Sequence, residues 1–155
     1  IATTGLSEEE NEYIKECSKE IPIFQSANMS FDINLMKKIV AEVAKALSNT
    51  DIEIIETHHN RKIDSPSGTA LALADSINEA LCNSKKYNFD RFSKREKRDK
   101  NEIGFSSIRG GNIVGEHIVS FFGENETFEI THKAYSRGVF AEGALKGAEF
   151  LVKQI

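Results

Sequence analysis

Two histidines and a lysine stand close together, just before a segment whose composition is typical of a helix start. His58 and His59 are adjacent, and Lys62 follows four positions after His58. A histidine side chain titrates at about pH 6.5 and can therefore give or accept a proton at neutral pH. A lysine side chain is a compact cation with several hydrogen-bond donors. Together they suit an anionic substrate that must also receive a proton.

Residues 65–69, Ser-Pro-Ser-Gly-Thr, predict the beginning of a helix. Proline suits the first helical turn because its missing N–H is not needed there, and Gly68 lets a ligand approach the backbone closely. The free N–H groups of a helix N-terminus carry about half a positive charge and bind anions, and the hydroxyls of Ser67 and Thr69 add donors. We expect a doubly negative ligand here if this terminus and Lys62 share a cleft; on an open surface the segment is an ordinary helix cap.

The sequence leaves two other interpretations of the histidine pair open. One is a solvated surface pair, since adjacent residues of a continuing strand point to opposite sides and usually only one faces a given site. The other is a metal-dependent hydrolase with His58, His59 and Asp64 as ligands. Because the zinc helix motif instead places a glutamate between histidines one helical turn apart, we expect no metal.

Other polar residues nearby have more than one expected role. Glu56 is expected to orient a histidine or to be merely polar at the strand end, and Asp64 to pack the turn or cap the helix. His117 and His132 lie in predicted strands, where we expect structural rather than catalytic roles. Arg137, just after these strands, could meet a carboxylate.

The elements that position these residues are predicted from the spacing of apolar side chains. Helices are expected at 31–47, 67–82 and 140–152, and a strand at 51–56. Further strands are expected at 103–109, 113–122 and 127–133, joined by turns that contain glycine and asparagine. The predicted class is α+β, with a mixed or antiparallel sheet and helices on one face, flanked by remnants of a Rossmann-type α/β domain.

The first part of the chain has a different pattern. Ser7 and Glu10 form a capping box that predicts a helix to about Ser18, and residues 21–24 predict a short buried strand. This is the end of an alternating β-α-β pattern, which builds parallel sheets. Since two strands cannot make such a sheet alone, we expect one or more upstream βα units to be absent from this chain.

Bulk composition narrows the class of protein. The net charge of −4 argues against nucleic acid as the main partner, because phosphate binding needs a basic face. No apolar run approaches the roughly 20 residues of a membrane span, and no signal-peptide pattern opens the chain. Cys17 and Cys82 lie far apart, so we expect reduced thiols and a cytoplasmic location. Residues 83–102 hold eight of the twenty basic residues, diluted by acidic ones, and are expected to form a long surface loop.

Residues 53–70 resemble the signature of the dihydrodipicolinate reductase family, E-[IV]-x-E-x-H-x3-K-x-D-x-P-S-G-T-A, and meet every fixed position. Shorter segments are similar to other family motifs: 3–5 to its Gly-Thr-Thr-Gly loop, 26–30 to its Ala-Asn-Phe-Ser segment, and 113–117 and 132–137 to its C-terminal strands. The resemblance implies reduction of the cyclic dicarboxylate 4-hydroxy-tetrahydrodipicolinate (dihydrodipicolinate) by NADH or NADPH in diaminopimelate and lysine biosynthesis. It also implies a homotetramer.

The resemblance further implies roles for individual residues. His58 is the general acid/base beside the substrate ring, and Lys62 is a proton donor. The substrate carboxylates are bound by His59, Ser67, Gly68 and Thr69. The nicotinamide side of the cofactor cleft is lined by Ala2, Thr3, Thr4, Ser26, Ala27, Asn28 and Met29.

The family pattern divides the chain into three parts, and the chain departs from that pattern near its start. Residues 1–29 are the end of a dinucleotide-binding domain, 30–137 the substrate-binding and oligomerisation domain, and 138–155 a helix returning to the first domain. Ala2 replaces a glycine and Met29 a phenylalanine of the family, which alters the cofactor fit. Nothing in the sequence supplies the G-x-G-x-x-G pyrophosphate loop. The alternative expectation is therefore a non-catalytic fragment that only oligomerises and binds dicarboxylates.

Overall fold

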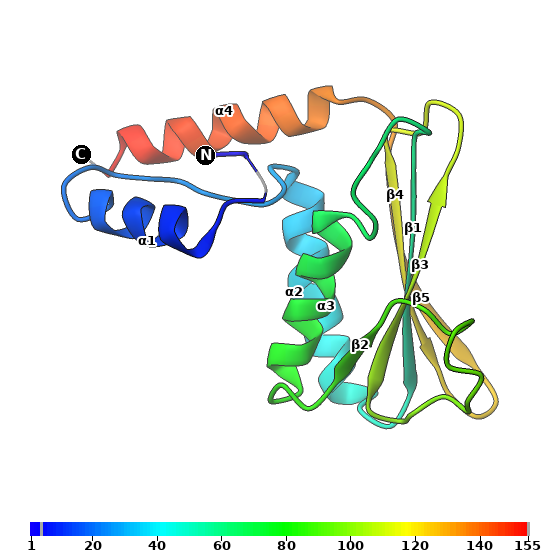
Figure 1. Cartoon of the computed structure of the whole chain (residues 1–155). Helices are drawn as coiled ribbons and strands as arrows, with labels where there is room; N and C mark the ends of the chain where they lie inside the picture. Colours follow the sequence, from blue (N-terminus) through cyan, green and yellow to red (C-terminus); the bar gives the residue numbers. More distant parts are fainter. Residues whose placement is uncertain (4, 155) are drawn as a thin grey trace.

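Within residues 1–3 and 5–154, which the computed structural model describes, five strands form one mixed sheet (Figure 1). The strands are β1 Asp51–His58, β2 Lys86–Asn88, β3 Glu102–Arg109, β4 Gly115–Phe122 and β5 Thr127–Ala134. They lie in the order β2-β3-β1-β4-β5. β3 is parallel to β1 and β2, whereas β4 is antiparallel to β1 and β5. The predicted α+β class with a mixed sheet is confirmed.

Two helices cover one face of this sheet and build the hydrophobic core. α2 Phe31–Ala46 and α3 Gly68–Ala80 pack side by side against it, while no described helix covers the opposite face (Figure 1). Side chains of β1 alternate between buried and partly exposed, and its buried set starts with Ile52 and Ile54. These two pack in one core with Val40 of α2 and Leu73 of α3, all of them fully buried. The helices therefore lie on the face toward which the alternate residues of β1 point.

The observed ends of β1 and α3, which flank the predicted site, differ from the predicted ends by a few residues. α3 is capped by Ser67, whose side chain accepts a hydrogen bond from the Ala70 amide. Pro66 therefore precedes the cap, and the prediction that it lies within the first turn is wrong. α3 ends earlier than predicted, and Cys82 beyond it adopts a positive φ of 57°. β1 runs two residues beyond its predicted end and carries His58 as its last residue.

α1 Glu8–Cys17 and α4 Gly138–Val152 lie away from the sheet, near both ends of the chain (Figure 1). The predicted capping box at the start of α1 is present. The strand predicted at 21–24 is not formed. The chain there makes only two backbone bonds to Ile1, from the Ile1 nitrogen to the Phe24 oxygen at 2.5 Å and from the Ser26 amide to the Ile1 oxygen at 3.1 Å. One such step of parallel pairing is too short to constitute a strand.

None of the described helices combines the length and the apolar character that a membrane span requires.

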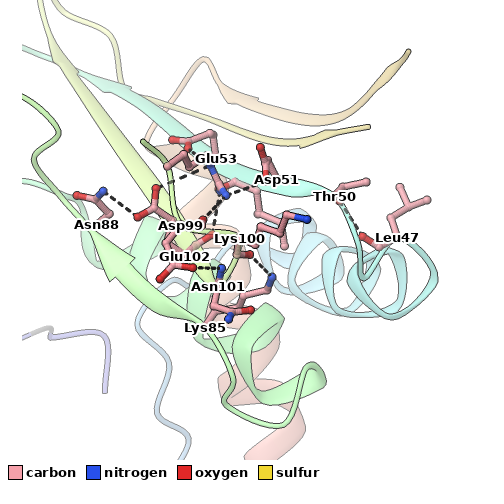
Figure 2. A network of polar contacts seen from close by, with 12 residues as sticks. Leu47, Thr50, Asp51, Glu53, Lys85, Asn88, Asp99, Lys100, Asn101 and Glu102 are labelled. Carbon is pink, nitrogen blue, oxygen red and sulfur yellow. Dashed lines mark hydrogen bonds and ion pairs between the residues drawn. The ribbon is translucent and has the colours of Figure 1, made fainter. Parts of the chain in front are cut away.

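The basic segment 83–102 is in part the predicted surface loop, since residues 89–97 are exposed and form no helix or strand, but it is also anchored to the sheet, which was not predicted. Part of it forms β2. Arg98 donates hydrogen bonds to Asp51 at 2.9 Å and to Glu53 at 3.2 Å, both at the start of β1. Figure 2 shows these two carboxylates in one polar network with Glu102, the first residue of β3. The sequence pattern did not predict this because the partners of Arg98 are more than forty positions away.

Gly143 marks the closest approach of α4 to the segment before α2. A Cβ at this position would lie 1.8 Å from the carbonyl oxygen of Met29. Replacing a helical glycine with alanine normally stabilises a helix by about 1 kcal/mol. Gly143→Ala is instead expected to lower the free energy of unfolding in urea by roughly 1–3 kcal/mol, because α4 must move away from the backbone it contacts.

Gly110→Ala is the matched control for this experiment, since no atom lies within 4 Å of a Cβ at that turn position. It should leave the free energy of unfolding close to that of the wild type. A Gly143→Ala protein at least as stable as the control would contradict the close packing of α4 on Met29.

Candidate functional site

A cavity of about 340 Å³ lies where the end of β1 meets the start of α3 and the segment before α2. One part of its wall is formed by His58, His59, Lys62 and Thr69, and another by Ala2, Ala27, Asn28 and Met29. His117 of β4 and His132 of β5 also line it. The imidazoles, the ammonium group and the first turn of α3 therefore share one cavity, which is the arrangement that the sequence pattern required.

Other residues predicted for the site lie beside the cavity. Ser67 is 2% exposed and does not line the cavity, because neighbouring residues cover it. Thr3, Ser26 and Gly68 line an adjacent groove on the other side of the α3 N-terminus. Thr4 lies outside the described residues. Some of the residues predicted to contact a ligand therefore line the cavity, and others line the adjacent groove.

Glu56 and Arg109 hold the ring of His58. Glu56 lies two residues before His58 on the same face of β1, and its carboxylate contacts Nδ1 of the imidazole. Burial opposes ionisation of Glu56, which is 1% exposed, but hydrogen bonds from His58 and Arg109 outweigh it. They hold the pKa of this carboxyl well below its usual range. This is the geometry expected of a carboxylate that orients a histidine, one of the two roles considered for Glu56.

His59 also lines the cavity, because β1 ends at His58 and the chain turns there. The expectation that only one of the two histidines faces the site is therefore wrong. Nη2 of Arg137 lies 3.4 Å from Nε2 of His59. Desolvation, followed by the positive charges of Arg61 and Arg137, holds the pKa of His59 below its usual value. His59 is accordingly an uncharged hydrogen-bonding group at neutral pH.

The ammonium group of Lys62 is held at the cavity by Asp64. Its Nζ lies 2.8 Å from Oδ1 of Asp64, and the lysine side chain is only 21% exposed. Partial burial raises the pKa of Asp64, but the hydrogen bond and charge of Lys62 outweigh it and lower that pKa. Asp64 therefore stays ionised at neutral pH and restrains the lysine, rather than acting as a free acid beside the cavity.

Thr69 is the residue of the first turn of α3 that reaches the cavity. Its hydroxyl oxygen accepts a hydrogen bond of 2.9 Å from the side-chain amide of Asn28. The side-chain oxygen of Asn28 in turn accepts a 2.8 Å bond from the Ser30 amide, which precedes α2. Asn28 thus ties together the two parts of the cavity wall.

His117 is a buried neutral ring behind His58. The two ring centroids lie 5.2 Å apart in an edge arrangement, and Nε2 of His117 is 3.0 Å from the hydroxyl of Ser67. Burial, followed by the charge of His58, lowers the pKa of His117 to about 3. His132, its partner in the β4–β5 pairing, also has a pKa lowered by burial. Both were predicted to be structural, yet both line the cavity.

The buried His117 predicts a loss of stability in mild acid. Its pKa is about 3 in the folded chain and about 6.5 in an unfolded one, so the unfolded chain binds the proton first as the pH falls. Its contribution is complete above about pH 6.5 and falls by roughly 1.4 kcal/mol per pH unit below it. Urea unfolding between pH 7 and 5 measures this slope, to which His59 and His132 add with the same sign. His117→Gln should flatten it; an equally steep slope in that variant would contradict the assignment.

The charges around the cavity favour an anionic ligand. The two nearby acids are already engaged, Glu56 by Arg109 and Asp64 by Lys62. The groups that line the cavity and can donate to a ligand are the Lys62 ammonium group, which has donors beyond the one that Asp64 accepts, the imidazoles and the hydroxyl of Thr69. In the described part of the chain, no three histidine, cysteine or acidic side chains are grouped so that they could hold a metal ion. The arrangement is suited to binding a carboxylate and transferring a proton.

Arg109 is the neighbour of the site that sequence reasoning missed. It is the last residue of β3 and lies opposite His58 in the parallel β1–β3 pairing. A basic residue directly before the Gly110-Gly111 turn was the available signal. Spacing along the sequence does not show which strands become neighbours, so the pattern could not place Arg109 next to Glu56.

Comparison with known proteins places these residues in a family context. Residues 32–155 match the family model described as dihydrodipicolinate reductase, C-terminus. The chain is 57% identical over 154 residues to a 4-hydroxy-tetrahydrodipicolinate reductase of Caldanaerobacter subterraneus subsp. tengcongensis, covering 99% of this chain and 61% of that protein. It is 52% identical to the protein of the same name from Clostridium botulinum, covering 97% of this chain and 60% of the relative. The chain thus spans about three fifths of the length of these relatives.

The fold is similar to a solved structure described as dipicolinate-bound dihydrodipicolinate reductase from Paenisporosarcina sp. TG-14. The TM-score is 0.69 at 27% sequence identity, and the match covers 99% of this chain and 58% of the other. The similarity therefore extends over the sheet, the helices that cover it and the two end segments of this chain.

Proposed function

Because the chain belongs to the dihydrodipicolinate reductase family, we propose that its cavity binds a cyclic dicarboxylate and serves the NADH- or NADPH-dependent reduction of 4-hydroxy-tetrahydrodipicolinate to tetrahydrodipicolinate. This is a step of diaminopimelate and lysine biosynthesis. The observation that carries the proposal is the meeting of His58, Lys62 and Thr69 in one cavity. It is supported by the dipicolinate described for the similar solved structure.

The cavity provides donors for two substrate carboxylates. We assign one carboxylate to the Lys62 ammonium group and the Thr69 hydroxyl, and the other to His59. Charge-assisted hydrogen bonds contribute about 1.5–3 kcal/mol each when partly buried, against about 0–1 kcal/mol for exposed ion pairs. Lys62 is in the first regime because its side chain is 21% exposed. In this proposal Ser67 and Gly68 contribute by forming the N-terminus of α3, whose free backbone amides favour an anionic ligand.

In this proposal Lys62 is the proton donor of the reaction and His58 is its general acid/base. When bound, the reduced nicotinamide would supply a hydride to the substrate ring. For the reaction to balance, one proton must also arrive and the 4-hydroxyl group of the substrate must leave as water. Lys62, which is held at the cavity by Asp64, donates that proton. His58 acts as the acid/base beside the ring, with its Nδ1 occupied by Glu56 and Nε2 left for the ligand. Burial lowers the pKa of His117 and of His132, so both rings are uncharged at neutral pH and add no further proton donor in the form of an imidazolium.

The residues near the cavity mouth fit a nicotinamide ring. Ala2 and Ala27 are small and exposed, and with Met29 they give a largely apolar wall for a flat ring. Thr3 and Ser26 of the adjacent groove add hydroxyl groups. We assign these residues and Asn28 to the nicotinamide side of the site. Gly143 of α4 packs closely against the backbone carbonyl of Met29.

We further propose that residues 30–137 form the substrate-binding and oligomerisation domain, and that 1–29 and 138–155 belong with a dinucleotide-binding domain. In support, α1 and α4 lie away from the sheet (Figure 1). The sheet face that no described helix covers, and the exposed Ile108 and Phe122 on it, support a homotetramer built through the sheet. Sedimentation equilibrium should give four times the chain mass; a monomer at all concentrations would contradict it.

The test of the activity follows the absorbance of reduced nicotinamide in the presence of this chain, the substrate and either NADH or NADPH. We expect cofactor oxidation that depends on the substrate. Calorimetric titration with dipicolinate is run in parallel. Binding of dipicolinate without any cofactor oxidation would contradict the reductase assignment and support a non-catalytic module that holds dicarboxylates. Activity that survives a strong chelator would exclude the metal-dependent hydrolase.

A further inference from the structure

The guanidinium group of Arg109 donates four hydrogen bonds to groups from three segments of the chain. Its Nη1 and Nη2 donate to the two carboxylate oxygens of Glu56 at 2.8 and 2.7 Å. Nη2 also donates to the backbone oxygen of Asp64 at 2.7 Å, and Nη1 to that of Ile108 at 2.8 Å. One guanidinium group therefore joins the end of β3, the end of β1 and the turn that leads into α3.

Glu56 is an unusual residue for its place in the sheet. It occupies the buried face of β1 that Ile52 and Ile54 share, and it is 1% exposed. A carboxylate at such a position is costly unless it is paired and hydrogen-bonded. Besides Arg109, it accepts a 3.2 Å bond from the Ser67 amide and contacts Nδ1 of His58. It does not line the cavity, so it acts on a ligand only through its neighbours.

The contact with Glu56 fixes how His58 presents itself to the cavity. An ionised carboxylate can only accept, so Nδ1 of His58 must carry a proton. Nε2 is then the free nitrogen, and it lies on the cavity side, 3.1 Å from where a Cβ of Gly115 would be. The second nitrogen of a histidine commonly sets the tautomer of the first in this way.

The same guanidinium also reaches the turn that carries Lys62. The Asp64 backbone is bound by Arg109, and the Asp64 carboxylate is bound by Lys62. We propose that Arg109 is a positioning residue that holds His58, through Glu56, and Lys62, through Asp64, in one fixed relation at the cavity. This inference rests on the proposed reductase function and assigns to Arg109 no contact with substrate or cofactor.

Arg98 offers a closely matched control. Its side chain is 19% exposed, the same as that of Arg109, and it likewise binds acids of β1. Its partners Asp51 and Glu53, which Figure 2 shows, lie near the first residue of that strand, whereas Glu56 lies near its last. Arginine-to-lysine substitution keeps the charge at both positions but removes the planar fork that binds two oxygens at once. Both variants should lose similar stability, and only one should lose function.

The first measurement compares Arg109→Lys with Arg98→Lys in the full chain. For Arg109→Lys we expect kcat to fall by about 10- to 100-fold, as for a misplaced catalytic group, with a smaller change in KM. For Arg98→Lys we expect kcat within about two-fold of the wild type, since the effect there is on stability alone. Urea unfolding of both variants measures the stability. Equal kcat values in the two variants would overturn the proposal.

A second measurement needs no turnover. Nitrogen-15 NMR of the His58 ring reports which nitrogen carries the proton. We expect the Nδ1–H form in the wild type and in Arg98→Lys, and a mixture of tautomers in Arg109→Lys. If the wild-type chain lacks reductase activity but shows this difference, the reductase assignment fails and the positioning role stands. If the chain is active and the His58 tautomer is the same in all three proteins, the positioning role is overturned and the reductase assignment stands.

Discussion

Replacing Lys62 with alanine is expected to lower kcat for the proposed reduction of the cyclic dicarboxylate by about 100- to 10,000-fold, the range that a positioned proton donor contributes. The lysine lies in the cavity with its ammonium group 2.8 Å from Asp64. The variant loses the proposed proton source and also the charge that faces a substrate carboxylate, so KM should rise as well. Initial rates from the reduced-nicotinamide absorbance, taken over a range of substrate concentrations, separate the two effects.

Lys45→Ala is the matched control for this experiment. Lys45 lies in the last turn of α2 and pairs with Glu42 at 2.8 Å, with its side chain 52% exposed. It does not line the cavity. Its removal should leave kcat and KM nearly unchanged, because exposed ion pairs contribute only about 0–1 kcal/mol to stability. Equal losses of kcat in Lys62→Ala and Lys45→Ala would refute the role of Lys62.

His58→Gln is expected to have the second large effect, a fall in kcat of about 100- to 10,000-fold. Glutamine keeps a polar group of similar length that Glu56 can bind, but it cannot exchange a proton near neutral pH. The loss should therefore fall on the chemical step rather than on substrate binding. Steady-state rates measure the first, and calorimetric titration with dipicolinate measures the second.

A folding defect must be excluded as the cause of the fall in kcat, because His58 is buried beside Glu56. Urea unfolding of His58→Gln supplies that control, and dipicolinate binding within about ten-fold of the wild type would show an intact cavity. A variant that folds, binds dipicolinate and retains wild-type kcat would show that His58 takes no part in proton transfer.

Local spacing was sufficient to predict the residues that meet at the cavity from one stretch of chain. His58, Lys62 and Thr69 lie within twelve positions, and a strand end followed by a helix start leaves them few ways to separate. The helices of the core were predictable for a similar reason, since the apolar stripe of α2 has one favourable face. The serine caps of α2 and α3 then set where each helix begins.

What the sequence did not reveal depends on contacts between distant segments. Arg109 reaches Glu56 only because β3 pairs in parallel with β1, in a register that puts it opposite His58. His117 and His132 enter the cavity because β4 adds to the other edge of β1 and β5 follows it. A histidine in an isolated strand pattern gives no sign of which neighbour it will face. The misassigned strand at 21–24 has the same origin, because a strand requires a partner as well as a suitable composition.

We propose that one cavity holds a dicarboxylate between Lys62, His58 and the first turn of α3. A crystal structure of this chain with dipicolinate would show whether it does. We expect the ligand in that cavity, with carboxylate oxygens within about 3 Å of Nζ of Lys62 and of the Thr69 hydroxyl, and its ring beside Nε2 of His58. Dipicolinate bound at another surface, with this cavity holding only water, would contradict the proposed site.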